Sequence, residues 1–178
     1  MFLRMLITIL VLPGIVLIFV PALILWITTD PETGLTVAGR DELNYWTGIA
    51  AGTVGLILAV STVRLFLSQG GGTPAPWDPP PKLVIAGPYR HVRNPMITAV
   101  LLILIGESLI FQSSAIGTWM LVFFVVNGVY FPLSEEKGLE ERFGDDYRRY
   151  KENVPRWIPR MNPWFDPVNE PEEAEEEK

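Results

Sequence analysis

Two short polar motifs hold the residues of this sequence that are best able to do chemistry. The first is Gly-Pro-Tyr-Arg-His-Val-Arg-Asn-Pro at residues 87–95, directly before a long apolar run, and the second is the pair Glu135 and Glu136, shortly after the next apolar run. Arginine side chains bind carboxylates and phosphates, and glutamates accept hydrogen bonds from amines and hydroxyls. Such groups at the mouth of a membrane helix are costly and are usually there for function. The two motifs predict a polar binding site at a membrane surface.

The composition limits what that site can use. The chain has 178 residues, enough for one domain, and 49% of them are hydrophobic, which indicates a membrane protein. It contains no cysteine, which excludes disulfides, thiolate metal sites and a cysteine nucleophile, and its single histidine argues against a histidine-rich metal site. We therefore expect no metal, and chemistry that uses Asp, Glu, Arg, Tyr, Asn or a bound cofactor.

Four apolar segments are long enough to span a bilayer, which takes roughly 17 to 25 residues. They cover about Leu3–Thr29, Trp46–Leu67, Pro95–Phe111 and Ala115–Leu133. A cleavable signal peptide is the alternative for the first segment, but its apolar run exceeds the roughly 7 to 15 residues of a signal core. The predicted fold class is an all-α integral membrane protein with about four transmembrane helices and a C-terminal cytoplasmic amphipathic helix.

Short connections and small residues predict how these segments pack. Only residues 112–114 separate the third segment from the fourth, so the two should form a tight antiparallel hairpin. In the second segment, Gly48, Gly52 and Gly55 would let another helix approach closely.

Basic residues predict the orientation in the membrane. A four-helix topology places one group of basic residues on one side: Arg4, Arg64, Lys82, Arg90, Arg93 and all those after the fourth segment. Only Arg40 falls on the other side. By the positive-inside rule, both termini and both polar motifs are cytoplasmic. The loop between the first two segments and the hairpin turn then face outward together.

The organisation along the chain follows from these segments. We expect two transmembrane helices and an outer loop in residues 1–68, a cytoplasmic Pro/Gly-rich loop with the basic motif in 69–94, and a transmembrane hairpin in 95–133. Residues 134–168 form a cytoplasmic cofactor-site helix and a Pro/Trp-rich segment, and residues 169–178 form a disordered acidic tail. The stretch at residues 70–81 is a plain linker or, through Trp77, a lid over a pocket.

The segment after the fourth span has a helical pattern. Leu139, Phe143, Tyr147 and Tyr150 recur at spacings of four, four and three, and so line one face of an amphipathic helix that Gly144 weakens or breaks. This aromatic face packs against the membrane surface or the bundle, or forms a pocket wall. Prolines then end the regular structure, and three aromatic residues beyond it are expected at the membrane interface. They are Trp157, Trp164 and Phe165.

The joint order of these motifs resembles the isoprenylcysteine carboxyl methyltransferase family and its relatives among the phospholipid methyltransferases. The resemblance runs from about Lys82 to Arg160. It is carried by Gly87-Pro88-Tyr89-Arg90-x-x-Arg93-x-Pro95-Met96, the hairpin, Glu135-Glu136, Phe143-Gly144-x-x-Tyr147-x-x-Tyr150 and Val154-Pro155-Arg156-x-Ile158-Pro159. It implies an integral membrane enzyme that takes S-adenosylmethionine from the cytoplasm and methylates a lipophilic or isoprenoid-like substrate arriving from the bilayer. Its partners would be that substrate and membrane lipids, without nucleic acid.

The resemblance also implies roles for individual residues. Arg93, with Arg90, would pair with the carboxylate of the cofactor or substrate, and Glu135 or Glu136 would hold the cofactor's amino group or ribose hydroxyls, or orient Arg93. Catalytic roles fall to Arg93 and Glu136. The cofactor-binding set comprises Gly87, Tyr89, Arg90, Arg93, Asn94, Pro95, Met96, Glu135, Glu136, Tyr147 and Tyr150. The structural alternative for the glutamate pair is negative charge at a helix N-terminus just after Ser134.

Two positions depart from the family pattern, which usually has Arg-His-Pro, one further residue and then Tyr. Asn94 replaces the histidine, and it can donate and accept hydrogen bonds but cannot transfer a proton. Ile97 replaces the tyrosine and makes that part of the pocket more apolar.

Three further polar residues each have two interpretations. His91 either contacts the cofactor or substrate or is a satisfied interfacial histidine. Glu107, inside the third segment, is a functional candidate by default, but its place near the hairpin turn favours interfacial exposure or a hydrogen bond to the second helix. Arg64 is most simply a snorkelling residue.

Two other functions are compatible with the sequence. A noncatalytic membrane scaffold or accessory subunit could keep the outline of the pocket, and Asn94 is compatible with it. A membrane reductase that uses a nicotinamide cofactor is the second alternative; the chain has no G-x-G-x-x-G run, which argues mildly against it.

Overall fold

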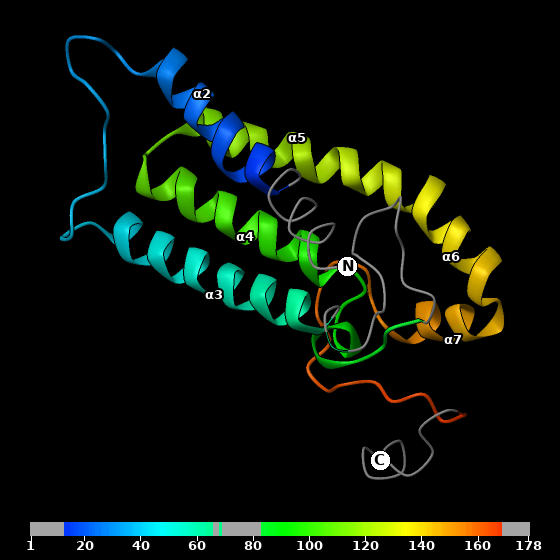
Figure 1. The fold of residues 1–178 in the computed structure, drawn as a ribbon. Coiled ribbons are helices and arrows are strands. Elements are labelled where there is room, and N and C mark those ends of the chain that lie inside the picture. The colour runs from blue at the N-terminus through cyan, green and yellow to red at the C-terminus, as the bar shows by residue number, and fades with distance from the viewer. Residues whose placement is uncertain (1–12, 66–67, 69–82, 169–178) are drawn as a thin grey trace. The chain divides into compact units, whose positions relative to one another are not determined.

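The computed structural model describes residues 13–65, 68 and 83–168, and regular structure within these residues is entirely helical (Figure 1). The elements are η1 (Ile15–Phe19), α2 (Val20–Thr28), α3 (Leu43–Leu65), η3 (Gly87–Arg90), α4 (Pro95–Ile110), α5 (Ser114–Tyr130), η4 (Phe131–Glu135), α6 (Glu136–Phe143) and α7 (Asp145–Asn153). The helices α2, α3, α4 and α5 lie where the apolar segments predicted helices. The expected start of the first segment, the Pro/Gly-rich stretch at 70–81 and the acidic tail lie outside the described residues.

Two helices of the described part are long and apolar enough to cross a membrane, namely Leu43–Leu65 and Ser114–Phe143. The apolar helices Ile15–Thr28 and Pro95–Ile110 are shorter. Large apolar side chains such as Leu56 on α3 and Val125 on α5 are exposed, although an apolar side chain gains by leaving water. Exposed apolar helix faces of this kind are typical of surfaces that contact lipid.

The helix of the fourth apolar segment does not end where the charged residues begin. Helical backbone continues from α5 through the π-helical turn η4 into α6, and Glu135 itself has helical angles (φ −66°, ψ −47°). Pro132 lies in that turn, and a wider turn is one way for a helix to accommodate the missing N–H of proline. The glutamate pair is therefore inside a continuous helix. The interpretation of Glu135 and Glu136 as charges at a helix N-terminus is wrong, because no free N-terminus exists there.

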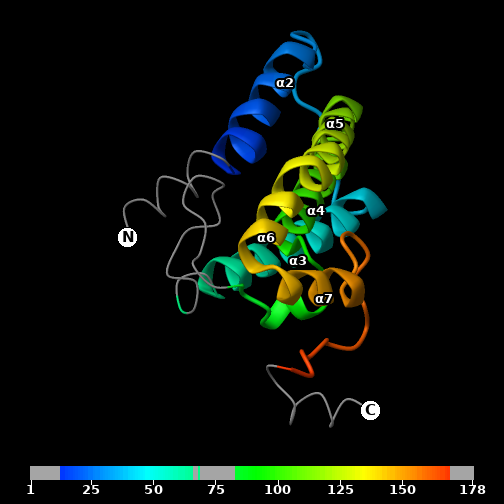
Figure 2. The ribbon, with the colours of Figure 1, turned by 90° about the vertical axis from the view of Figure 1, so that its right-hand side faces the viewer.

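Gly144 ends this long helix. Its backbone angles (φ 56°, ψ −126°) belong to a region that residues other than glycine rarely adopt, because their Cβ atom would clash. The chain turns sharply here, and α7 leaves α6 at a steep angle (Figures 1 and 2). The break predicted at Gly144 is confirmed.

Contacts divide the chain into two compact units, and the first comprises residues 1–59 and 97–129. Within it, α3 and α4 approach backbone to backbone: a Cβ on Gly106 would lie 2.7 Å from the carbonyl oxygen of Gly48, and one on Gly55 would lie 2.8 Å from that of Ala99. The predicted packing role is thus confirmed for Gly48 and Gly55, whereas a Cβ on Gly52 would meet no atom within 4 Å. A small core of Val100, Leu104 and Ile116 is covered by side chains of η1, α2 and α5.

The loop after α2 and the hairpin turn lie together in this unit, as the topology predicted. The amide of Ala38 donates to the carbonyl of Ile110 at 2.8 Å, and the side chain of Gln112 donates to that of Glu42.

The second unit, residues 60–96 and 130–178, contains both polar motifs. Its core consists of Tyr147, Tyr150, Val154 and Trp164, against which Leu83, Ile85, Leu139 and Phe143 pack. The predicted aromatic face of 139–150 therefore exists and packs inward within this unit. Trp164 is buried in that core, so its expected place at the membrane interface is wrong.

Candidate functional site

The basic motif is fixed in place by the segment that follows α7. The amide of Arg93 donates to the carbonyl of Pro155 at 2.9 Å, that of Arg160 to His91 at 2.9 Å, and that of Trp164 to Arg90 at 3.0 Å. These bonds recur along both segments, and they therefore fix the register between residues 90–93 and residues 155–164. Arg93 thereby lies beside Arg156, the residue that follows Pro155.

His91 takes part in this bracing. Its ring nitrogen Nδ1 lies 2.9 Å from the carbonyl oxygen of Arg160. A carbonyl can only accept, so Nδ1 carries the proton and donates it there. This contact supports the interpretation of His91 as a satisfied structural histidine.

The turn before Arg93 is held from several sides. Gly87 begins it with a positive φ of 53°, and the hydroxyl of Tyr150 donates to the carbonyl of Tyr89 at 2.8 Å. The Nε of Arg90 donates to the carbonyl of Ile85 at 3.4 Å, and its guanidinium lies 4.0 Å from the centre of the Phe165 ring. Burial, with smaller effects of neighbouring tyrosines, raises the pKa of Tyr150, so its hydroxyl keeps the proton that it donates. Burial, with the charge of Glu135, likewise raises the pKa of Tyr89.

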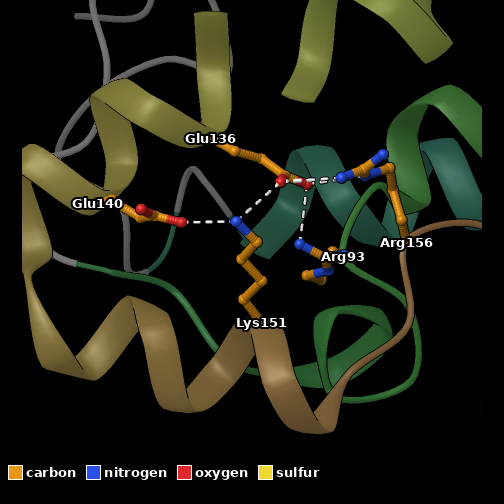
Figure 3. Close-up of polar contacts among 5 residues, drawn as sticks. All are labelled: Arg93, Glu136, Glu140, Lys151 and Arg156. Carbon is orange, nitrogen blue, oxygen red and sulfur yellow. Dashed lines mark hydrogen bonds and ion pairs between the residues drawn. The ribbon is translucent and has the colours of Figure 1, made fainter. Parts of the chain in front are cut away.

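A cluster of ion pairs joins Arg93, Glu136, Glu140, Lys151 and Arg156 (Figure 3). Glu136 is 4% exposed, and its Oε1 accepts a hydrogen bond from Arg93 Nη1 at 2.8 Å. Arg156 binds both oxygens of the same carboxylate, through Nε to Oε1 at 2.7 Å and Nη2 to Oε2 at 2.9 Å. Lys151 Nζ lies 3.5 Å from Oε2. One buried carboxylate is thus shared by three cations, which together favour its charged form.

A second carboxylate completes the cluster at its outer side. Lys151 donates to Glu140 Oε1 at 2.6 Å and so links α7 to α6. The hydrogen bond from Lys151 to Glu140 raises the pKa of Lys151, so the lysine stays charged. The side chain of Arg93 is 10% exposed, whereas those of Arg156 and Lys151 are 23% and 38% exposed. The five residues hold one more positive than negative charge, and the most deeply buried cation is Arg93.

Arg93 also has an unused donor. Its Nε is buried and has no hydrogen-bond partner among the described residues. Tyr147 lies beside it: burial raises the pKa of Tyr147 to about 12, the charge of Glu136 adds to this effect, and Arg93 opposes it. A buried N–H of a guanidinium without a partner is costly. An acceptor on a ligand would remove that cost.

The structure brings the two predicted motifs together. Arg93 and Glu136, 43 positions apart in sequence, are in direct contact, with Tyr147 beside them and Tyr89 and Tyr150 in the surrounding shell. The other predicted residues lie as follows: Gly87 and Arg90 in the turn, Asn94 half-buried next to Arg93, Pro95 fully buried at the start of α4, Met96 half-buried after it, and Glu135 half-buried before Glu136. Glu135 makes no ion pair with another described residue.

Sequence reasoning did not select Arg156 or Lys151. Arg156 stands in the Val-Pro-Arg-x-Ile-Pro motif that carried the family resemblance, and that motif was the signal that could have found it. Lys151 had no such signal, because its contacts depend on the sharp turn at Gly144 that sets α7 against α6.

Glu107 and Arg64 lie apart from this cluster in the sequence. Glu107 is half-buried in α4, and its Oε2 is buried without a hydrogen-bond partner among the described residues. That oxygen therefore makes no hydrogen bond to the second helix, and the expected exposure of Glu107 at the interface stays a prediction. Arg64 is exposed in the last turn of α3, as a snorkelling residue would be.

Comparison with known proteins identifies the family of this chain. The phospholipid methyltransferase family matches residues 43–146, which include Arg93 and Glu136. A protein of Haemophilus influenzae, described as uncharacterized, is 38% identical over 63 residues, which are 35% of this chain and all of that protein. No solved structure matches the chain. Because the family match covers more than half of the 178 residues, the chain belongs to the phospholipid methyltransferase family and is a membrane protein of a methyltransferase family.

Proposed function

We propose that this protein uses S-adenosylmethionine to methylate a lipophilic or isoprenoid-like acceptor that reaches it from the bilayer. Family membership supports methyl transfer, and the buried cluster of Arg93, Glu136 and Arg156 supports a site for a charged cofactor. The single observation that carries the proposal is the buried Arg93 Nε, which lacks a partner among the described residues.

The residues present fit the chemical groups of this cofactor. Its amino-acid part carries a carboxylate and an ammonium group, and its ribose carries two hydroxyls. Arg93 offers a buried donor to a carboxylate, and guanidinium–carboxylate pairs are strong because both partners are charged. Glu135 offers an acceptor to the ammonium group or the hydroxyls. The excess positive charge of the cluster favours an anionic group near Arg93.

Within this proposal, the two glutamates have different tasks. Glu136 already accepts hydrogen bonds from Arg93 and Arg156 and lies 3.5 Å from Lys151, so it orients Arg93. Glu135 has no such partners in the described part, which favours it for cofactor contact. Asn94 lies beside Arg93 in sequence and adds a hydrogen-bonding amide. The ring of Tyr147 forms one wall of the site.

The chemistry needs mainly position and exclusion of water. When bound, S-adenosylmethionine supplies a methyl group on a positively charged sulfur, and transfer to a lone pair of the acceptor leaves a neutral thioether. Arg93, held by Glu136, would fix the orientation of the reacting groups, and such orientation lowers the barrier by removing entropy in advance. The apolar surroundings formed by Tyr147, Tyr150 and Phe143 would keep water away. Neither Arg93 nor Asn94 has to transfer a proton in this scheme.

We also propose the topology that the sequence predicted. Four spans with both termini in the cytoplasm place the cluster at the cytoplasmic face, where the cofactor is available. The two long apolar helices and the two shorter ones support this arrangement.

A binding experiment tests the proposal against its two alternatives. The full chain, purified in detergent, is titrated by calorimetry with S-adenosylhomocysteine and, separately, with reduced nicotinamide dinucleotides. The proposal expects saturable heat from the first ligand only. Heat from a nicotinamide alone would favour a reductase, and heat from neither would favour a scaffold.

A matched pair of variants ties the binding to the site. Arg93→Gln should abolish binding of S-adenosylhomocysteine, whereas Arg148→Gln should leave it unchanged. Arg148 is a suitable control because its side chain is 63% exposed and, among the described residues, pairs with Asp145 of the same helix, α7. Equal binding by both variants would show that Arg93 is not part of a cofactor site.

A further inference from the structure

Two apolar side chains on the segment after α7 are almost fully exposed. Ile158 is 80% exposed and Met161 is 92% exposed. Single apolar residues are common on protein surfaces, so exposure alone does not indicate a partner.

The segment that holds them is braced. Arg160, between the two apolar residues, exchanges two hydrogen bonds with His91: its amide donates to the His91 carbonyl and its carbonyl accepts from His91 Nδ1, both at 2.9 Å. The amide of Trp164 is tied to Arg90 at 3.0 Å. Ile158 and Met161 are therefore presented from a fixed backbone, and a partner would not have to order this segment first.

The contact of Trp157 shows beside which turn of the long apolar helix Ser114–Phe143 the segment lies. The ring of Trp157 packs edge-on against that of Phe131, with centroids 6.2 Å apart at 90°. Phe131 stands in the last apolar turn of the helix Ser114–Phe143, because Phe131-Pro132-Leu133 is followed at once by Ser134-Glu135-Glu136. In a membrane-crossing helix, the change from apolar to charged residues marks the membrane boundary. The segment after α7 thus lies at that boundary.

We propose that residues 157–161 form a membrane-contact loop that inserts Ile158 and Met161 among the lipids. The partner is the interfacial region of the bilayer itself. Trp157 is of the residue type that favours this region, and the positive charge of Arg160 suits lipid phosphates. The contact with Phe131 favours lipid over a second protein, since it fixes the loop where the helix leaves the apolar layer. This inference does not depend on methyl transfer, because the loop would contact lipid whether or not a cofactor binds.

The absence of cysteine from the chain makes a direct test possible. Ile158→Cys and Met161→Cys are each labelled with a nitroxide in the full chain, which is placed in lipid nanodiscs of phosphatidylcholine and phosphatidylglycerol. Both positions are so exposed that a label adds little strain. Two further labels give reference values: Val125→Cys, on the exposed apolar face of α5, for lipid, and Arg148→Cys, on the exposed face of α7, for water. Collision rates are measured with oxygen, which concentrates in lipid, and with a water-soluble nickel complex.

The collision rates of the two labels in the loop should be closer to those of the label at position 125 than to those of the label at position 148. Oxygen should reach them readily, and the nickel complex several-fold less often than it reaches position 148. Nickel collision rates equal to those at 148 would overturn the proposal, because the loop would then lie in water. Shielding of both labels from both reagents would also overturn it, because another protein surface would then cover the loop.

Discussion

Replacement of Arg156 by glutamine is the most informative perturbation of the ion cluster. The change removes two charge-assisted hydrogen bonds to Glu136, at 2.7 and 2.9 Å, and leaves that buried carboxylate with Arg93 and the more distant Lys151. Hydrogen bonds to charged groups contribute about 1.5–3 kcal/mol each. Because the Arg156 side chain is 23% exposed, water offsets part of the loss, and we expect the whole substitution to cost about 1.5–3 kcal/mol rather than twice that.

The cost can be measured as a shift of the thermal midpoint in detergent, followed by tryptophan fluorescence. For a chain of this size, 1 kcal/mol corresponds to roughly 2–4 °C. Arg156→Gln should therefore lower the midpoint by about 3–12 °C. The control Arg148→Gln breaks a surface pair with Asp145, which is worth at most about 1 kcal/mol, and should lower the midpoint by less.

A double-mutant cycle tests whether Arg156 acts through Glu136. In a Glu136→Gln background, Arg93 and Arg156 face each other without the carboxylate between them, so their charges repel. Removing Arg156 should then cost much less than in the wild type, and it can even stabilise the protein. Equal shifts for Arg156→Gln in the two backgrounds, or a shift no larger than that of Arg148→Gln, would refute the assigned role of the cluster.

Three other predictions follow from the geometry. Gly144→Ala should lower the thermal midpoint by several degrees, because its backbone conformation costs roughly 1–3 kcal/mol for other residues. Gly138→Ala, in the interior of α6 with nothing within 4 Å of an added Cβ, should instead raise the midpoint slightly, and the reverse order would contradict the assigned backbone strain. Gly106→Val should disrupt the packing of α3 on α4 and reduce the yield of folded protein in detergent, whereas Gly128→Val, with no atom within 4 Å of an added Cβ, should not; equal yields would show that the close approach is unimportant. Glu107→Gln should leave S-adenosylhomocysteine affinity near that of the wild type, and a loss as large as that of Arg93→Gln would place the cofactor site elsewhere.

The sequence allowed prediction of the helices and of the meeting of Arg93 with Glu136. Long apolar runs depend only on composition and length, so α3, α4 and α5 lie within a few residues of their predicted bounds. The hairpin between residues 95 and 133 led to the expectation that the two polar motifs share one face, and the 2.8 Å contact between Arg93 and Glu136 agrees with that expectation.

Features that depend on register were not predictable in the same way. Arg156 reaches Glu136 because the amide of Arg93 pairs with Pro155, a contact between segments more than 60 positions apart that no local pattern encodes. The onset of charge at Ser134 suggested a new element, although serine, glutamate and lysine are compatible with a continuing helix. Trp164 among prolines suggested an interfacial residue, but the backbone bond to Arg90 draws it into the core of Tyr147 and Tyr150.

Methyl transfer that depends on Arg93 can be measured directly in membranes. Membranes from cells that express the wild-type chain are incubated with S-adenosylmethionine labelled in its methyl group, and radioactivity is counted in the organic extract that holds lipids. Membranes with equal amounts of the Arg93→Gln and Arg148→Gln variants are treated in the same way. We expect extracted label from the wild type and Arg148→Gln, and only background label from Arg93→Gln. Wild-type membranes that yield no more extracted label than Arg93→Gln membranes would contradict the role of Arg93 in methyl transfer.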